Sequence, residues 1–239
     1  SVGLTGGGEI KVDCDTGTLL QFWGNEEKVT LPQKVMGAAI TKINDNVFQD
    51  LKTLKSITIP DSYTEIGDGA FAGCSSLETV SIGSGLETIG KDAFHGCVKL
   101  KDITLPDSLT TIGENAFYEC KSLTEMVIPG KITELPDSVF YECDDLETVV
   151  LPEGLEQIGI NAFAGCNGLK NINLPDSLTK IGRDIFANCT QLTEISIPSG
   201  ITEIPDSAFI YDFALNKVEL PDNLVSVGGR AFDGCEGLR

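Results

Sequence analysis

Apolar positions recur every 23 residues along most of the chain. A leucine follows each of nine phenylalanines by six residues, and a pair of apolar residues separated by one position comes next, as in Val80 and Ile82. One coil of this length cannot bury its own apolar side, whereas stacked coils can. The pattern therefore predicts a solenoid in which each phenylalanine stacks on the next. The phenylalanines are Phe48, Phe71, Phe94, Phe117, Phe140, Phe163, Phe186, Phe209 and Phe232.

The apolar pair predicts the secondary structure of each coil. Its period of two indicates one short strand with two inward side chains, and stacked strands would form a parallel sheet. A proline after the pair in most coils ends the strand, because proline cannot donate to the ladder. Glycines such as Gly67, Gly90 and Gly113 predict a turn with unusual backbone angles. The segment around each phenylalanine predicts a single helical or 3₁₀ turn on the convex side.

Seven cysteines form a column of their own, three residues after a phenylalanine. Side chains 23 residues apart would stack in register, so we expect buried thiols that donate weakly to loop carbonyls. Disulfides between adjacent coils and a metal site are the alternatives. Asp212 interrupts the column, which we expect to cause local repacking. The column consists of Cys74, Cys97, Cys120, Cys143, Cys166, Cys189 and Cys235.

These motifs resemble a known family. Leu77, Val80, Ile82 and Leu86 match the strand segment of leucine-rich repeats. The 23-residue unit is similar to that of the BspA-like, or Treponema pallidum-type, surface proteins, and the similarity covers residues 29–239. The resemblance implies a curved leucine-rich-repeat solenoid with a parallel sheet on its concave side. It also implies a secreted or cell-surface location and a role in adhesion or host-protein binding.

The two ends differ from the repeat. Residues 1–28 do not repeat, and the segments EIKVDC and TLLQFWG, split by a turn-like DTG, predict a hairpin. This hairpin is expected to cap the first coil. Residues 29–239 predict about nine coils, the first with a five-residue insertion around MGAAI. The chain stops where a further strand would begin, so we expect a truncated solenoid.

Charge restricts the partners. The formal net charge is −19, from 36 acidic and 17 basic residues, and a nucleic-acid-binding protein needs the opposite balance. No stretch of 18 apolar residues is present, so no membrane insertion is expected. A basic or neutral macromolecule, or a carbohydrate, fits better, and the high charge favours a soluble monomer.

Catalytic chemistry finds little support. His95 is the only histidine, and its coil offers no nucleophile for a triad. The segment TGGGE lacks the Lys-Ser/Thr of a phosphate loop. The recurrent Pro-Asp-Ser, as at Asp61, is explained by turn chemistry in which Asp and Ser bond their own backbone. No enzyme activity, cofactor or metal is expected.

The outward positions of the strands are the candidate binding surface. Val127 and Val150 would be neighbours that expose apolar area on a polar concave face, with Tyr118 and Tyr141 near its edge; such patches are enriched at interfaces. Alternatively, a β-branched residue simply suits a strand. We expect a non-catalytic adhesion module whose concave face binds a host or neighbouring-cell macromolecule, such as an extracellular-matrix or host-surface protein or a glycan. A carbohydrate-binding or scaffold domain of a larger secreted protein is the alternative. The candidate residues are Asp102, Glu125, Thr148 and Asn171 in one column, and Val127, Val150 and Asn173 in the next.

Overall fold

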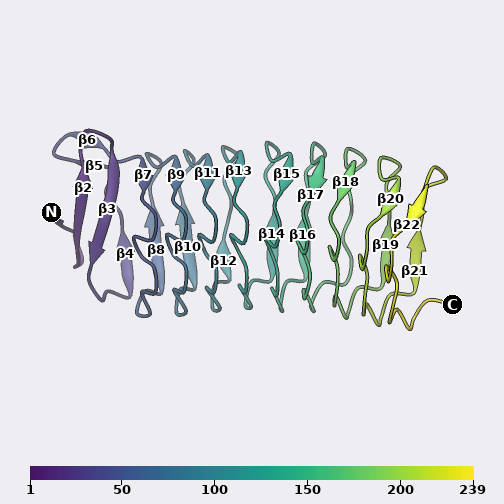
Figure 1. The fold of residues 1–239 in the computed structure, drawn as a ribbon. Helices are drawn as coiled ribbons and strands as arrows, with labels where there is room; N and C mark the ends of the chain where they lie inside the picture. Colours follow the sequence, from purple (N-terminus) through teal and green to yellow (C-terminus); the bar gives the residue numbers. More distant parts are fainter. The chain divides into compact units, whose positions relative to one another are not determined.

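The computed structural model describes residues 1–239 and consists of strands and turns without any helix (Figure 1). It contains two compact units, Ser1–Cys120 and Lys121–Arg239. In both units the repeat of 23 residues sets the register, and each coil is one turn of a β-solenoid.

The first unit begins with the predicted hairpin. Strands β2 (Glu9–Asp13) and β3 (Thr18–Trp23) pair antiparallel, and β1 (Val2–Gly3) pairs with β2. Strand β3 then pairs in parallel with β7 (Lys42–Ile43) of the first coil. The hairpin therefore extends the sheet of the coils, and its role as a cap stays a prediction.

Each coil of the first unit carries two kinds of strand rather than the one expected. The apolar pair forms the strand that we call the major strand, and a two-residue minor strand follows the proline turn. In the sequence, a recurrent aliphatic residue such as Ile89 or Ile112 marks this position. A strand of two residues is too short to show the alternation of apolar and polar residues from which a strand is predicted. The major strands are β4 (Lys28–Thr30), β8 (Ser56–Ile59), β10 (Thr79–Ile82) and β12 (Asp102–Ile103). The minor strands are β7, β9 (Glu65–Ile66), β11 (Thr88–Ile89) and β13 (Thr111–Ile112). The insertion in the first coil forms a small hairpin of β5 (Lys34–Val35) and β6 (Ala38–Ala39).

The second unit repeats this arrangement with interruptions. Its major strands pair as β14 (Glu125–Val127) with β16 (Thr148–Val150), and as β19 (Glu194–Ser196) with β21 (Lys217–Glu219). Its minor strands are β15 (Glu134–Leu135), β17 (Gln157–Ile158) and β18 (Lys180–Ile181), followed by the pair β20 (Glu203–Ile204) and β22 (Ser226–Val227). Both kinds of strand are parallel to their neighbours.

The prediction of a helical turn around each phenylalanine is wrong. The residues two before and two after every repeated phenylalanine have a positive φ, as at Asp92 (54°) and Gly96 (73°). A helix cannot continue through such left-handed residues. Instead, N–H groups alternate between a carbonyl three residues back and a carbonyl of the next coil. The Phe94 N–H, for example, donates to the Ala116 carbonyl at 2.8 Å.

The glycine before this segment has a different role from the one expected. Gly113 does not have a positive φ, but a Cβ there would lie 2.4 Å from the backbone nitrogen of Lys91 in the preceding coil. Gly67 and Gly90 face the same contact with the coil before them. The glycine column therefore permits a close approach between coils.

Phenylalanine rings form the core in both units. Within the first unit, consecutive rings from Phe48 to Phe117 lie 5.0–5.4 Å apart and nearly parallel. Within the second, those from Phe140 to Phe232 lie 5.3–5.7 Å apart. These spacings suit offset stacking, and the expected stack of rings is confirmed within each unit.

The cysteine column donates to loop carbonyls, as expected. The thiols of Cys74, Cys97, Cys120, Cys166, Cys189 and Cys235 each lie 3.0–3.2 Å from the carbonyl of the phenylalanine 26 residues earlier, for instance Cys97 Sγ from the Phe71 oxygen. A small apolar group with a weak donor suits this buried position. All eight cysteines are free thiols, and burial raises the pKa of the Cys97, Cys166 and Cys189 thiols.

The Pro-Asp-Ser turns bond to neighbouring coils, not to their own backbone as expected. Asp61 Oδ1 accepts the backbone N–H of Ser84, one repeat later, at 2.7 Å. Ser108 Oγ donates to the Leu86 carbonyl of the coil before it. Stacking brings these backbone groups closer than the groups of the turn itself, a proximity that a single repeat does not reveal.

Candidate partner-binding surface

Val127 and Val150 lie side by side on the outward face of the major strands of the second unit. They are register partners in β14 and β16, and their neighbours Met126 and Val149 point into the core. Because side chains alternate along a strand, burial of Met126 and Val149 forces both valines outward, where they are 60% and 50% exposed. The structure thus places this apolar pair as the sequence predicts. Its role in binding stays a prediction.

Polar residues surround the two valines. Glu125 and Thr148 are register partners beside them, and both are exposed. Asn171 and Asn173 are exposed on the coil that follows β16. The predicted residues of the second unit therefore share one outward face, which we call the major face.

The coil with the two asparagines departs from the ladder. Residues 171–174 form no strand and pair with neither β16 nor β19 (Figure 1). A groove of about 490 Å³ lies on the β19 side and is lined by Asn171, Asn173 and residues of β19 and β21. A second groove of about 320 Å³ lies on the β16 side and shares Asn173.

The grooves are acidic. Their carboxylates come from Glu153, Asp176, Glu194 and Glu219. Lys217 Nζ contacts Glu219 Oε1 at 2.8 Å. This hydrogen bond raises the pKa of Lys217 and lowers that of Glu219, so both groups are charged at neutral pH. Glu194, Lys217 and Glu219 occupy outward strand positions, as the alternation of the sequence predicts. Glu153 and Asp176 follow the proline and were not predicted, because the sequence pattern assigns them to a turn.

The remaining predicted residues lie elsewhere. Asp102 and Tyr118 belong to the first unit, where the Tyr118 ring lies 4.5 Å from the ring of His95. Tyr141 is half-buried in the turn after Phe140 and packs against the Ala164, Ala187 and Ile210 cluster. Both tyrosines occupy the turn column rather than a strand, and a role for them in binding stays a prediction.

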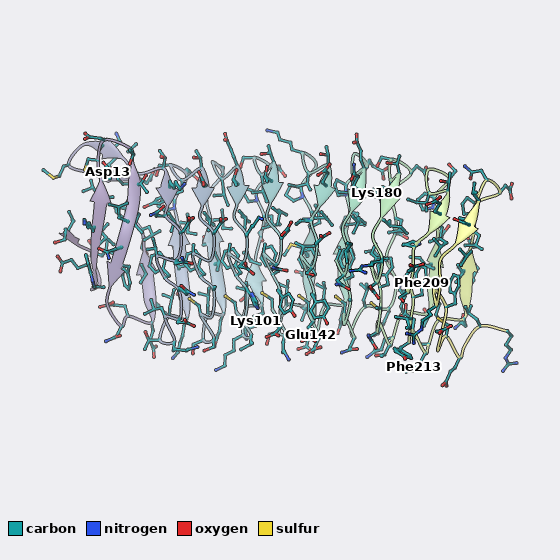
Figure 2. All side chains as sticks on the ribbon, in the orientation of Figure 1. Asp13, Lys101, Glu142, Lys180, Phe209 and Phe213 are labelled. Carbon is teal, nitrogen blue, oxygen red and sulfur yellow. The ribbon has the colours of Figure 1, made fainter.

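A second exposed apolar feature lies in the turn that breaks the cysteine column. The Tyr211 and Phe213 rings are exposed, and their centroids lie 6.2 Å apart. Figure 2 shows Phe213 at the lower rim of the second unit and Lys180 at the upper rim. The aromatic pair therefore lies in the turns at the lower rim of the second unit and not on the major face.

The ionisable groups form no cluster suited to a metal ion. His95 Nδ1 lies 2.9 Å from Asp92 Oδ1 in a partly exposed turn. No group of three or more His, Cys, Asp or Glu side chains has the arrangement of a metal site. None of the elements is a helix with the length and apolar character of a membrane span.

Comparison with known proteins identifies the repeat. Residues 41–158 and 133–239 match the model of the BspA type leucine rich repeat region (6 copies). A leucine-rich cell surface protein from Faecalibacterium prausnitzii is 27% identical with a TM-score of 0.75, and the match covers 97% of this chain and 79% of that one. The leucine-rich repeat protein of T. pallidum is 22% identical with a TM-score of 0.48, over 97% and 88% of the two chains. The pneumococcal vaccine antigen PcpA is 22% identical with a TM-score of 0.44, over 85% and 68%. No curated protein sequence matches the chain significantly.

Proposed function

The chain belongs to the BspA-type leucine-rich-repeat family, and we propose that it is an adhesion module of a secreted or cell-surface protein. It binds a protein of the extracellular matrix or of a host surface through the major face. The surface location is supported by the structural neighbour described as a leucine-rich cell surface protein.

The exposed pair Val127 and Val150 carries this proposal. Two register partners expose apolar side chains on a face whose other outward residues are polar. Desolvation of such a pair favours association, and apolar patches rimmed by polar groups are typical of interfaces. The charge on the rest of the face adds specificity rather than most of the affinity.

The arrangement of the ionisable side chains along the chain supports a non-catalytic role. The single histidine contacts Asp92 in a partly exposed turn, and the carboxylates recur in columns. General acid-base chemistry needs a positioned group beside a substrate site, whereas repeated columns offer a broad surface. This arrangement supports binding.

The test is a binding screen of the purified chain. Matrix proteins, plasma proteins and a glycan panel are tested at about 150 mM salt and again at about 500 mM, because salt screens non-specific attraction to an acidic surface. The double variant Val127→Lys/Val150→Lys is expected to lose at least roughly tenfold in affinity for the protein partner, since it charges the centre of an apolar contact.

A matched control separates this effect from added charge. Val225→Lys/Val227→Lys changes two valines that are 77% and 50% exposed outside the major strands and should alter affinity less than about twofold. Circular dichroism checks that both variants fold. If the Val127/Val150 variant binds as tightly as the unmodified chain, the major face is not the adhesive surface. Selective binding to glycans alone would favour a carbohydrate-binding domain.

A further inference from the structure

The break at residues 171–174 is local and bounded. On one side, the Thr193 N–H still donates to the Lys170 carbonyl at 3.0 Å; on the other, the Gly168 N–H donates to the Asp144 carbonyl at 2.8 Å. Bonding between coils resumes where the Thr179 N–H donates to the Glu156 carbonyl at 2.9 Å. The ladder therefore opens around four residues and closes again.

The sequence gives a reason for this opening. This is the only coil with asparagine at both outward positions of the major strand segment. Asparagine is depleted in strands, and its side chain competes with the ladder for backbone hydrogen bonds. Ile172 between the two asparagines remains buried at 5% exposure, so the opening does not disturb the core.

The opening makes backbone groups available to a ligand. Strand N–H and C=O groups lie in the plane of the sheet and point toward the neighbouring strands. Those of residues 171–174 bond to neither β16 nor β19, and these residues line the two grooves instead. Their volumes of about 490 and 320 Å³ fall within the range of ligand sites. An extended peptide carries complementary main-chain groups at matching spacing, as in recognition by strand addition.

The side chains of Asn171 and Asn173 fit the same ligand. Each amide offers a donor and an acceptor, as a peptide bond does. Asn171 and Asn173 are two residues apart along the chain, as are the equivalent groups of an extended peptide, which repeat about every 7 Å. The grooves contain no aromatic side chain on which a sugar ring could stack, so a peptide is favoured over a glycan.

The charges define the peptide further. Asp176 and Glu194 line the larger groove, and Glu153 lines the smaller one. Lys217 is already paired with Glu219 at 2.8 Å. We infer that the larger groove holds an extended basic segment of the protein partner, bound by its main chain to residues 171–174 and by its lysine or arginine side chains to Asp176 and Glu194. This inference rests on the proposed function and names the chemistry of the partner.

A peptide assay tests it on the full chain. The probe is a fluorescein-labelled peptide of roughly eight residues that alternates lysine and threonine, because an extended chain places alternate side chains on one face. Fluorescence anisotropy at about 150 mM salt should show saturable binding. Asn171→Ala/Asn173→Ala is expected to weaken it roughly tenfold through lost hydrogen bonds, and Asp176→Asn/Glu194→Gln by a similar factor.

Two controls distinguish a built site from general attraction to an acidic chain. Glu134→Gln/Glu203→Gln removes the same charge from exposed minor-strand positions of the same unit and should change affinity less than about twofold. The same peptide N-methylated at alternate amides keeps its charge but loses main-chain donors, and it should bind roughly tenfold more weakly. Equal binding of the methylated peptide, equal losses in the control variant, or no binding of the basic peptide would overturn the inference.

The outcome is separable from that of the proposed function. The peptide assay needs no identified partner, so its failure leaves a loss of adhesion in the Val127/Val150 variant standing. If a protein partner is found and the groove variants bind it as tightly as the unmodified chain, the basic-segment inference is wrong while the adhesion proposal holds.

Discussion

Asp212 shows how one residue can depart from its column and still be accommodated. It occupies a cysteine position and is fully buried, and its Oδ1 accepts the Cys189 N–H at 2.9 Å. Its Oδ2 is buried without a hydrogen-bond partner. Burial raises the pKa of Asp212 to about 9, because the charged form is poorly solvated there. The carboxyl is therefore neutral at neutral pH and substitutes for an uncharged thiol.

Asp212→Asn is expected to make the chain more stable, and more so at higher pH. The unfolded pKa is 3.8 and the folded pKa about 9, so between these values the folded state holds a proton that the unfolded state has lost. Stability consequently falls as pH rises through this window in the unmodified chain, and asparagine removes the effect. Urea unfolding should show that the advantage of the variant grows by on the order of 4 kcal/mol between about pH 5 and pH 8.

Asp222→Asn removes a carboxylate from an exposed position and is the matched control for the loss of one charge. A difference between Asp212→Asn and the unmodified chain that does not change with pH would mean that the buried carboxyl does not titrate in this range.

At the level of elements, the turns determine how closely coils approach. Two columns in the phenylalanine segment need positive φ, and a glycine column just before it needs the space of a missing Cβ. The sequence marked the turn correctly but assigned it the wrong conformation. Glycine alone does not reveal whether it serves a backbone angle or a close approach.

Alanine substitutions separate the two causes. Gly96 has φ 73°, but an added Cβ would meet its nearest atoms only at 3.8 Å, so Gly96→Ala should cost roughly 1–2 kcal/mol from the backbone angle alone. In Gly113→Ala the Cβ would lie 2.4 Å from backbone, and the coils must shift, at a cost of roughly 3 kcal/mol. Urea unfolding at one pH measures both costs. A larger loss of stability for Gly96→Ala than for Gly113→Ala would show that the spacing between coils adapts more easily than the backbone angle.

At the level of the whole molecule, charge opposes folding more than ion pairs support it. The net charge is −19, and close pairs such as Lys42–Glu65 at 2.9 Å and Lys55–Glu27 at 2.8 Å have substantially exposed side chains. Exposed pairs contribute little to stability, whereas repulsion among many like charges acts on the entire folded chain. Acidity therefore favours solubility and reduces stability.

Sodium chloride is accordingly expected to raise the thermal unfolding midpoint between about 20 and 300 mM, since screening shortens the reach of repulsion. Differential scanning fluorimetry at fixed pH measures the shift. Chloride is preferred to sulfate, which strengthens burial by exclusion from the surface. A lower midpoint at high salt would show that the ion pairs outweigh the net repulsion.

The sequence by itself determined the repeat and the orientation of its side chains. The alternation in each strand decides that Met126 and Val149 are buried and Val127 and Val150 exposed, because one buried face with period two leaves no other register. It also determined the phenylalanine stack and the thiol column, since identical residues 23 apart must meet when coils stack. These features follow from local pattern and identity.

Only the tertiary structure decided how neighbouring backbones meet. It showed the minor strands, the contact of Gly113 with the preceding coil, the bond of Asp61 to the next coil, and the open ladder at residues 171–174. Each depends on the distance between two coils at one point along the strand. That distance results from packing of residues a full repeat apart, and no single repeat encodes it.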